Sequence, residues 1–145
     1  MKNIIFFSKN LKIGGMEKAL VSLLNALSAY YKVTLVLEKK EGALLDELSS
    51  NIKVTEYQLS TSKNIVFRKI INFTKRIIWT IKNKNKYDFS CNYATYSIIG
   101  SKLAIISSKN SAFYIHSNYY EMYHGIKKDM DDFFVNHNLA KFNKI

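Results

Sequence analysis

Hydrophobic residues along the chain occur alternately in short continuous runs and in longer segments with helical spacing. Residues 3–8 form a short, apolar, β-prone run, and in residues 16–30 the apolar side chains recur at the i, i+3, i+4 spacing of a single helix face. A second β-prone run follows at residues 33–37. A strand, a helix and a strand in this order predict a βαβ unit, with a polar loop at residues 9–15 before the helix.

The same alternation continues through the rest of the chain. Further helical segments are predicted at residues 41–48, 62–86, 96–107 and 119–137. Further strands are predicted at residues 52–59, 87–92 and 112–116. Because consecutive units of this kind place their strands in parallel and cover them with helices, the predicted fold class is α/β. At 145 residues, the chain is expected to form one domain built on a doubly wound, Rossmann-like parallel sheet.

The long helix predicted at residues 62–86 is amphipathic. Its apolar residues, which gather within roughly 80° of arc at about 100° per residue, are Val66, Ile70, Phe73, Ile77 and Ile81. The opposite side carries Arg68, Lys69, Lys75, Arg76, Trp79 and Lys82. We expect the apolar side to pack on the sheet, and the basic side with an exposed Trp79 to meet an anionic membrane surface. A basic side that is only solvated is the alternative.

The charge balance narrows the range of partners. The chain has 22 Lys and Arg residues against 11 Asp and Glu residues, a formal net charge of +11. An anionic partner is therefore expected: nucleic acid, an acidic membrane or phosphate groups. Only two of the cations are arginines, and the sequence has no recognised nucleic-acid-binding motif. Readout of a base sequence is not predicted, so nucleic acid is the least favoured of the three.

Cysteine and histidine offer little for metal or redox chemistry. Cys91 is the only cysteine, which excludes a disulfide framework, and its place in an apolar strand predicts a packing role. The sequence has no C-x-x-C motif and no Cys/His cluster, so no metal or other cofactor is predicted. His124 and His137 are expected to be ordinary surface residues.

Targeting segments are not predicted either. The apolar run at residues 4–7 is too short for the apolar region of a signal peptide. No stretch approaches the roughly 18 consecutive apolar residues of a membrane-spanning helix. The expected location is cytoplasmic.

A loop with two glycines precedes the first predicted helix. Gly14 and Gly15 allow a ligand to approach the backbone closely, and N–H groups at a helix start suit a phosphate or a sugar hydroxyl. A tight turn packed against its neighbours is the alternative. Glu17 is interpreted as a capping residue favoured by the helix dipole. Glu38 lies at the end of the second strand, the position at which dinucleotide-binding folds have an acidic residue that binds the ribose. The G-x-G-x-x-G motif of those folds is missing, so nicotinamide or flavin binding is not predicted.

Polar residues also follow the last predicted strand. His116, Ser117 and Asn118 lie at its carboxyl end. In open parallel sheets, ligands bind in the crevice beyond the carboxyl ends of the strands. The Gly14–Gly15 loop and His116 are therefore expected at the same edge, as candidate binding residues. A polar strand end with His116 bonded to the backbone is the alternative.

The segment at residues 3–27, N-I-I-F-F-S-K-N-L-K-I-G-G-M-E-K-A-L-V-S-L-L-N-A-L, resembles the opening of the family 4 retaining glycosyltransferases. In that family a first strand leads into a G-G-x-E loop, here Gly14, Gly15 and Glu17, and the next helix carries L-x-x-A-L. F-Y-I-H-S-N at residues 113–118 is similar to the family's fifth strand, whose terminal histidine maps onto His116.

This resemblance implies a GT-B architecture, in which two doubly wound domains face each other. The amino-terminal domain holds mainly the acceptor, and the carboxyl-terminal domain holds the nucleotide-sugar, which is a substrate and not a cofactor. The Gly14–Gly15 loop would approach the diphosphate or sugar of the donor. His116 would contact sugar or acceptor, and a basic domain of this kind would sit on the membrane that carries a lipid-linked acceptor.

The sequence departs from the family pattern after its fifth strand. The pattern continues with another strand and a second domain containing E-x7-E, whereas residues 142–145, F-N-K-I, look like the approach to a sixth strand. Residues 1–145 are therefore expected to be an incomplete acceptor-side domain of a bacterial surface-polysaccharide glycosyltransferase, peripheral to the inner face of the cytoplasmic membrane. It would be inactive unless a partner chain supplies the donor domain. The alternative is a non-catalytic membrane- or polyanion-binding module.

Overall fold

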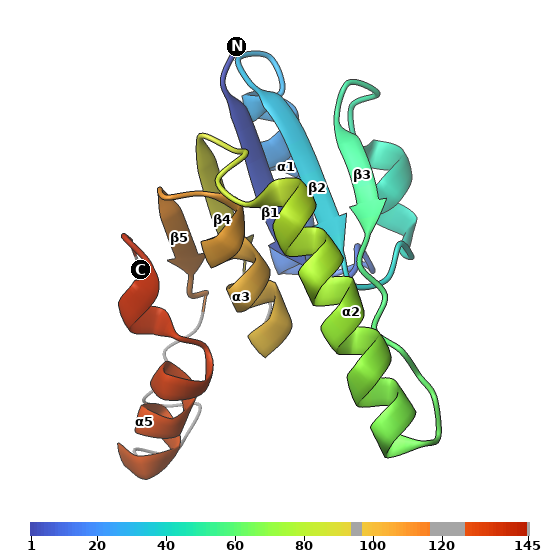
Figure 1. Ribbon diagram of the computed structural model, residues 1–145. Coiled ribbons are helices and arrows are strands. Elements are labelled where there is room, and N and C mark those ends of the chain that lie inside the picture. The colour runs from blue at the N-terminus through green and yellow to red at the C-terminus, as the bar shows by residue number, and fades with distance from the viewer. Residues whose placement is uncertain (94–96, 117–126, 145) are drawn as a thin grey trace.

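Five parallel strands form the centre of the chain in a computed structural model, which describes residues 1–93, 97–116 and 127–144 (Figure 1). The strands are β1 (Asn3–Ser8), β2 (Lys32–Leu37), β3 (Lys53–Glu56), β4 (Phe89–Tyr93) and β5 (Ser111–Tyr114). They lie in the order β3-β2-β1-β4-β5. With β1 central and the chain progressing outward in both directions, this is the doubly wound order of a Rossmann-like sheet, and the predicted fold class is confirmed.

Helices cover both faces of the sheet. The helical segments are α1 (Gly15–Leu27), η1 (Ala43–Glu47), α2 (Ile65–Asn83), α3 (Ile98–Ser107), α5 (Lys127–Asn136) and η2 (Leu139–Lys141). Figure 1 shows α1 on one face and α2 and α3 on the other. Alternate side chains of β1 serve the two faces: Ile4 and Phe6 pack in the core under α1, and Ile5 and Phe7 pack in the core that includes Leu103 of α3.

Two strands end earlier in the structure than the sequence predicts. β3 ends at Glu56, where its ladder with β2 ends at the pair formed by Leu37 and Glu56. β5 ends at Tyr114, two residues before His116, where its ladder with β4 ends at Tyr93. For the helix predicted at residues 119–137, α5 is the described part, and the remainder lies largely outside the described residues.

The orientation predicted for α2 is wrong. Trp79, expected to be exposed, is half-buried, with its ring centroid 6.0 Å from that of Phe7 on β1 and 5.7 Å from that of Tyr57 after β3. Its indole N–H donates to the Ser107 hydroxyl at 3.4 Å. The apolar residues expected to pack on the sheet are instead exposed: Val66, Ile70, Phe73, Ile77 and Ile81. The helix is therefore turned with its Trp79 side toward the core.

The sequence also predicts the wrong environment for His137. Its side chain is buried, its Nδ1 lies 2.9 Å from the Phe133 carbonyl oxygen, and its ring stacks on the Phe133 ring with centroids 4.2 Å apart. Both rings also make edge contacts with Phe113 of β5. His137 is thus part of the core that joins α5 to the sheet. His124 lies outside the described residues.

The residues after η2 run beside β5. Lys144 forms a parallel bridge with Ala112, and the Phe113 N–H donates to the Lys144 carbonyl at 3.0 Å. Asn143 contributes a side-chain acceptor for the Ser111 N–H at 2.8 Å. These contacts lengthen the parallel arrangement by one short segment on the β5 side.

Candidate functional site

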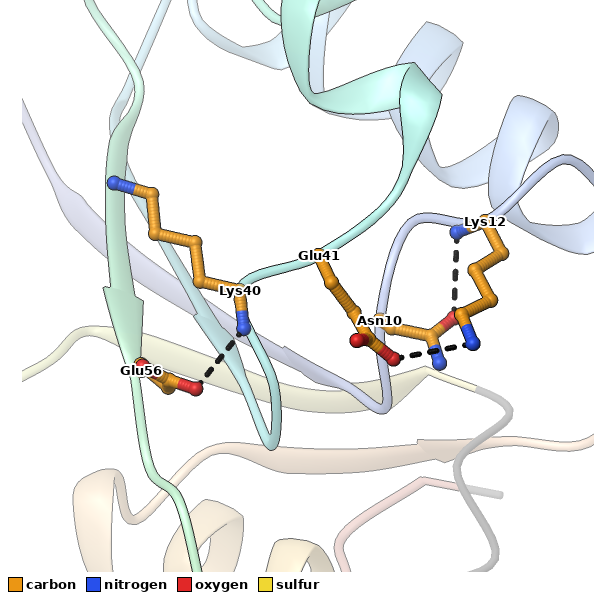
Figure 2. A network of polar contacts seen from close by, with 5 residues as sticks. All are labelled: Asn10, Lys12, Lys40, Glu41 and Glu56. Carbon is orange, nitrogen blue, oxygen red and sulfur yellow. Dashed lines mark hydrogen bonds and ion pairs between the residues drawn. The ribbon is translucent and has the colours of Figure 1, made fainter.

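The loops that follow β1 and β2 are joined at the carboxyl edge of the sheet, where the strands end. The buried Leu11 donates its N–H to the Glu41 carbonyl at 3.0 Å, and its own carbonyl accepts from the Leu44 N–H at 3.2 Å. Figure 2 shows the polar contacts beside this pair: Lys12 Nζ lies 3.2 Å from the Glu41 carboxylate, and the Lys40 N–H donates to Glu56 at 3.2 Å. The loops after β1 and β2 and the end of β3 therefore form one connected rim.

Gly42 makes this close approach of the two loops feasible. Its φ angle of 128° lies in the region that favours glycine. A Cβ at this position would fall on backbone atoms of Leu11 and Lys12. The sequence analysis missed Gly42, although a glycine at the second residue of the helical segment predicted at residues 41–48 was a usable signal.

The two glycines predicted as binding residues begin α1. Gly14 is the N-cap, in extended conformation and without a side-chain cap for the first-turn N–H groups. A Cβ at Gly14 would collide with the Glu17 carboxylate, whereas a Cβ at Gly15 would meet nothing within 4 Å. Open space in front of Gly15, next to uncapped N–H groups, is suited to an anionic or hydroxyl-bearing ligand.

His116 lies at the same edge, two residues beyond β5. Its side chain is exposed, and its ring centroid is 6.3 Å from that of Tyr114, which stacks on Tyr93 at 4.5 Å. β4 lies between β1 and β5, so about 10 Å of sheet separates the strands that carry the glycine loop and His116. The structure thus places them on one edge but two strands apart. Ser117 and Asn118 lie outside the described residues.

A hollow at this edge was not predicted from the sequence. It has a volume of about 480 Å³, and we call it the lysine hollow because three lysines, Lys9, Lys12 and Lys39, line it together with Glu38 and Glu41. Within the described parts of the chain, Glu38 Oε1 is buried and has no hydrogen-bond partner. Lysines attract phosphate groups, and a carboxylate oxygen accepts from hydroxyls. The hollow is therefore chemically suited to a ligand with both phosphate and hydroxyl groups.

Cys91 is a packing residue, as its position in the sequence suggested. Burial raises the pKa of its thiol to about 12, so the thiolate that could act as nucleophile is scarce at neutral pH. In residues 1–93, 97–116 and 127–144, His, Cys, Asp and Glu side chains form no group able to hold a metal ion. Across the same ranges, no helix has both the length and the apolar character needed to cross a membrane.

The fold and the site's geometry can be compared with known proteins. The solved structure of Anabaena HepE in complex with UDP and glucose superposes on 95% of this chain with a TM-score of 0.58, at 15% sequence identity. The chain spans 36% of the length of HepE. No protein-family model and no curated protein matches the sequence. At this identity the likeness establishes the Rossmann-like fold alone.

Proposed function

We propose that this chain is the acceptor-side half of a glycosyltransferase that moves a sugar from a nucleotide-sugar to a membrane-associated acceptor. The observation that carries the proposal is the open space beside Gly15 at the carboxyl edge of the sheet. The fold is shared with a protein whose structure was solved in complex with UDP and glucose. UDP and glucose together are the two parts of a nucleotide-sugar. The G-G-x-E resemblance supports the same activity, with retention of configuration, as in family 4.

The proposal assigns roles to residues of the site. The Gly14–Gly15 loop would receive the diphosphate or the sugar of the donor, with uncapped N–H groups as donors. His116 would contact sugar or acceptor, and Ser117 and Asn118, the next two residues of the sequence, remain candidate binding residues. The lysine hollow would hold a phosphorylated, hydroxyl-rich part of the acceptor, with Glu38 accepting from a hydroxyl.

The proposed setting is bacterial surface-polysaccharide synthesis at the inner face of the cytoplasmic membrane. A net charge of +11 favours an anionic surface. A second domain or a partner chain would hold the nucleotide part of the donor, so we expect no sugar transfer by the 145-residue chain alone.

We predict that, in an assay that also supplies the donor-binding half, Gly15→Val will reduce sugar transfer far more than it reduces stability. The added side chain enters space that is empty in the structure, so the free energy of unfolding should change by no more than about 1 kcal/mol. The same side chain obstructs the approach of a ligand to the backbone. Ala19→Val is the matched control, because it places the same β-branched residue at an exposed position of α1. Equal loss of transfer in both variants would favour the turn-only interpretation of the loop.

The function itself is tested with membranes from cells that lack the gene. Supplied with radiolabelled nucleotide-sugars, these membranes should incorporate label into lipid-linked or polysaccharide product only after the protein is restored. His116→Ala should lower incorporation by more than about tenfold, as expected for a polar group acting in the cleft. Tyr30→Ala, at an exposed position after α1, is the control.

Two outcomes would contradict this proposal in different ways. Incorporation that does not depend on the gene would overturn the activity. Normal incorporation with His116→Ala would remove His116 from the site and leave the activity standing. Vesicle binding without any dependence of sugar transfer on the gene would favour the non-catalytic membrane-binding module.

A further inference from the structure

An apolar surface lies on the side of α2 that faces away from the sheet. We call it the α2 stripe, and it consists of Val66, Phe67, Ile70, Phe73, Ile77, Ile78 and Ile81. Exposed fractions of its side chains run from 43% for Ile77 to 78% for Ile81. At about 100° per residue, the stripe spans roughly 140° of the helix surface. Contiguous exposure of this kind in a folded chain marks an interaction surface.

Polar contacts and one tryptophan hold α2 in this orientation. Asn72 accepts a hydrogen bond from the Ser60 N–H at 2.9 Å, and Lys75 Nζ donates to the Gln58 carbonyl. Trp79 packs against Phe7 and Tyr57. The amino-terminal half of α2 projects beyond the carboxyl ends of the strands, so no strand lies beneath it (Figure 1). The side opposite these contacts is the α2 stripe.

Cations border the α2 stripe along both sides. By the same helical geometry, Arg68, Lys75 and Lys82 form one row, and Lys69 and Arg76 form the other. Residues 63–86 contain eight basic residues and no acidic residue. An apolar face bordered by cations is the pattern of a helix that lies in a membrane interface, with its apolar side among the acyl chains and its cations at the head groups.

A hollow of about 470 Å³ lies beside one of these rows. Its lining includes Lys69, Arg76, Tyr57 and two residues of the α2 stripe, Ile70 and Phe73. The Tyr57 hydroxyl is buried and has no hydrogen-bond partner in the described part of the chain. Burial raises the pKa of Tyr57, although the charge of Arg76 offsets part of this effect, so the hydroxyl remains a donor at neutral pH.

The positive charge of the chain favours an anionic lipid surface over a second copy of the chain as the partner of the α2 stripe. A second copy of the chain has the same net charge of +11, and pairing two α2 stripes would bring four rows of cations together with no acidic residue of α2 to offset them. An anionic lipid surface has the complementary charge and an apolar interior. We propose that α2 docks on an anionic phospholipid bilayer through the α2 stripe, with lipid phosphates beside Lys69 and Arg76. This deepens the membrane part of the proposed function.

Vesicle cosedimentation tests the docking with the 145-residue chain. The chain should sediment with vesicles of phosphatidylglycerol and phosphatidylcholine in equal parts, and only weakly with phosphatidylcholine alone. Ile70→Ser with Ile77→Ser should weaken binding to the mixed vesicles at least about tenfold. Both side chains are exposed, so the melting temperature should change little. Val135→Ser, at an exposed apolar position of α5, is the matched control and should bind normally.

Charge reversal provides the second set of variants. Arg68→Glu with Lys82→Glu should weaken binding strongly, while Lys2→Glu with Lys53→Glu, at exposed positions away from α2, should do so much less. Inorganic phosphate at millimolar concentration should not displace the chain from vesicles, which distinguishes the bilayer from free phosphate as the ligand. Displacement by phosphate alone would overturn the proposal.

Fluorescence reports which side of α2 meets the lipid. Trp79 packs against the sheet side of the molecule, so its emission should stay unchanged on vesicles. A tryptophan introduced by Phe73→Trp should shift to the blue. The proposal would be overturned by a blue shift of Trp79 with none at position 73, or by equal vesicle binding of the wild type and the Ile70→Ser, Ile77→Ser variant. It would also be overturned if the chain formed a dimer that depends on Ile77 and did not bind vesicles. Vesicle binding as expected with no gene-dependent sugar transfer would overturn only the proposed activity.

Discussion

Gly42→Ala should lower the free energy of unfolding by about 3 kcal/mol or more, measured by urea denaturation. A methyl group at this position would occupy the space of Leu11 and Lys12 backbone atoms, and the residue has a φ angle of 128°. Strain at a positive φ costs about 1 to 3 kcal/mol by itself. Separation of the loops would break the hydrogen bonds between Leu11 and the 41–44 segment as well. The variant should therefore be among the least stable single substitutions in the chain.

The control for this prediction is Gly15→Ala. Gly15 begins α1, and its Cβ would meet nothing within 4 Å, so alanine should leave stability unchanged or raise it by up to about 1 kcal/mol. Gly42→Ala should also weaken the binding of any ligand to the lysine hollow, because the substitution separates the two loops that carry Lys12 and Lys39. A loss of stability below about 0.5 kcal/mol, within the ordinary range of surface substitutions, would contradict the close contact of the two loops.

Trp79→Ala should also destabilise the protein by about 3 kcal/mol and loosen α2 before the sheet unfolds. The indole contacts β1 through Phe7, the end of β3 through Tyr57 and α3 through Ser107. Loss of a large aromatic side chain at such a junction removes its packing and leaves a cavity. Hydrogen exchange of the α2 backbone amides should accelerate more than that of β1 and β2.

Ile77→Ala is the matched control for Trp79→Ala. Ile77 belongs to the α2 stripe and is exposed, so its truncation should cost about 0.5 kcal/mol or less. The pair of variants decides the orientation of α2 in solution. If Ile77→Ala destabilised the protein more than Trp79→Ala, the apolar side would face the sheet, as helical periodicity alone predicts.

The candidate site could be predicted in part because the geometry of parallel sheets brings certain positions together. Residues that follow β1 and β5 must lie at the carboxyl edge once both strands are parallel, and Gly14, Gly15 and His116 do lie there. The lysine hollow could not be predicted, because its lining comes from loops after three strands. Spacing along the chain contains no information on how closely those loops approach one another.

The sequence by itself determined the succession of strands and helices along the chain, since short apolar runs and a hydrophobic period of 3.6 residues are local properties. In β1 this was sufficient, because both sides of the strand are buried and an apolar run suits either face. Only the tertiary structure decided which side of α2 faces inward. Periodicity divides a helix into sides, but packing and hydrogen bonds with the rest of the chain choose between them. Here Trp79 packs against Phe7 and Asn72 accepts a hydrogen bond from Ser60, so the opposite side of the helix, the α2 stripe, is exposed.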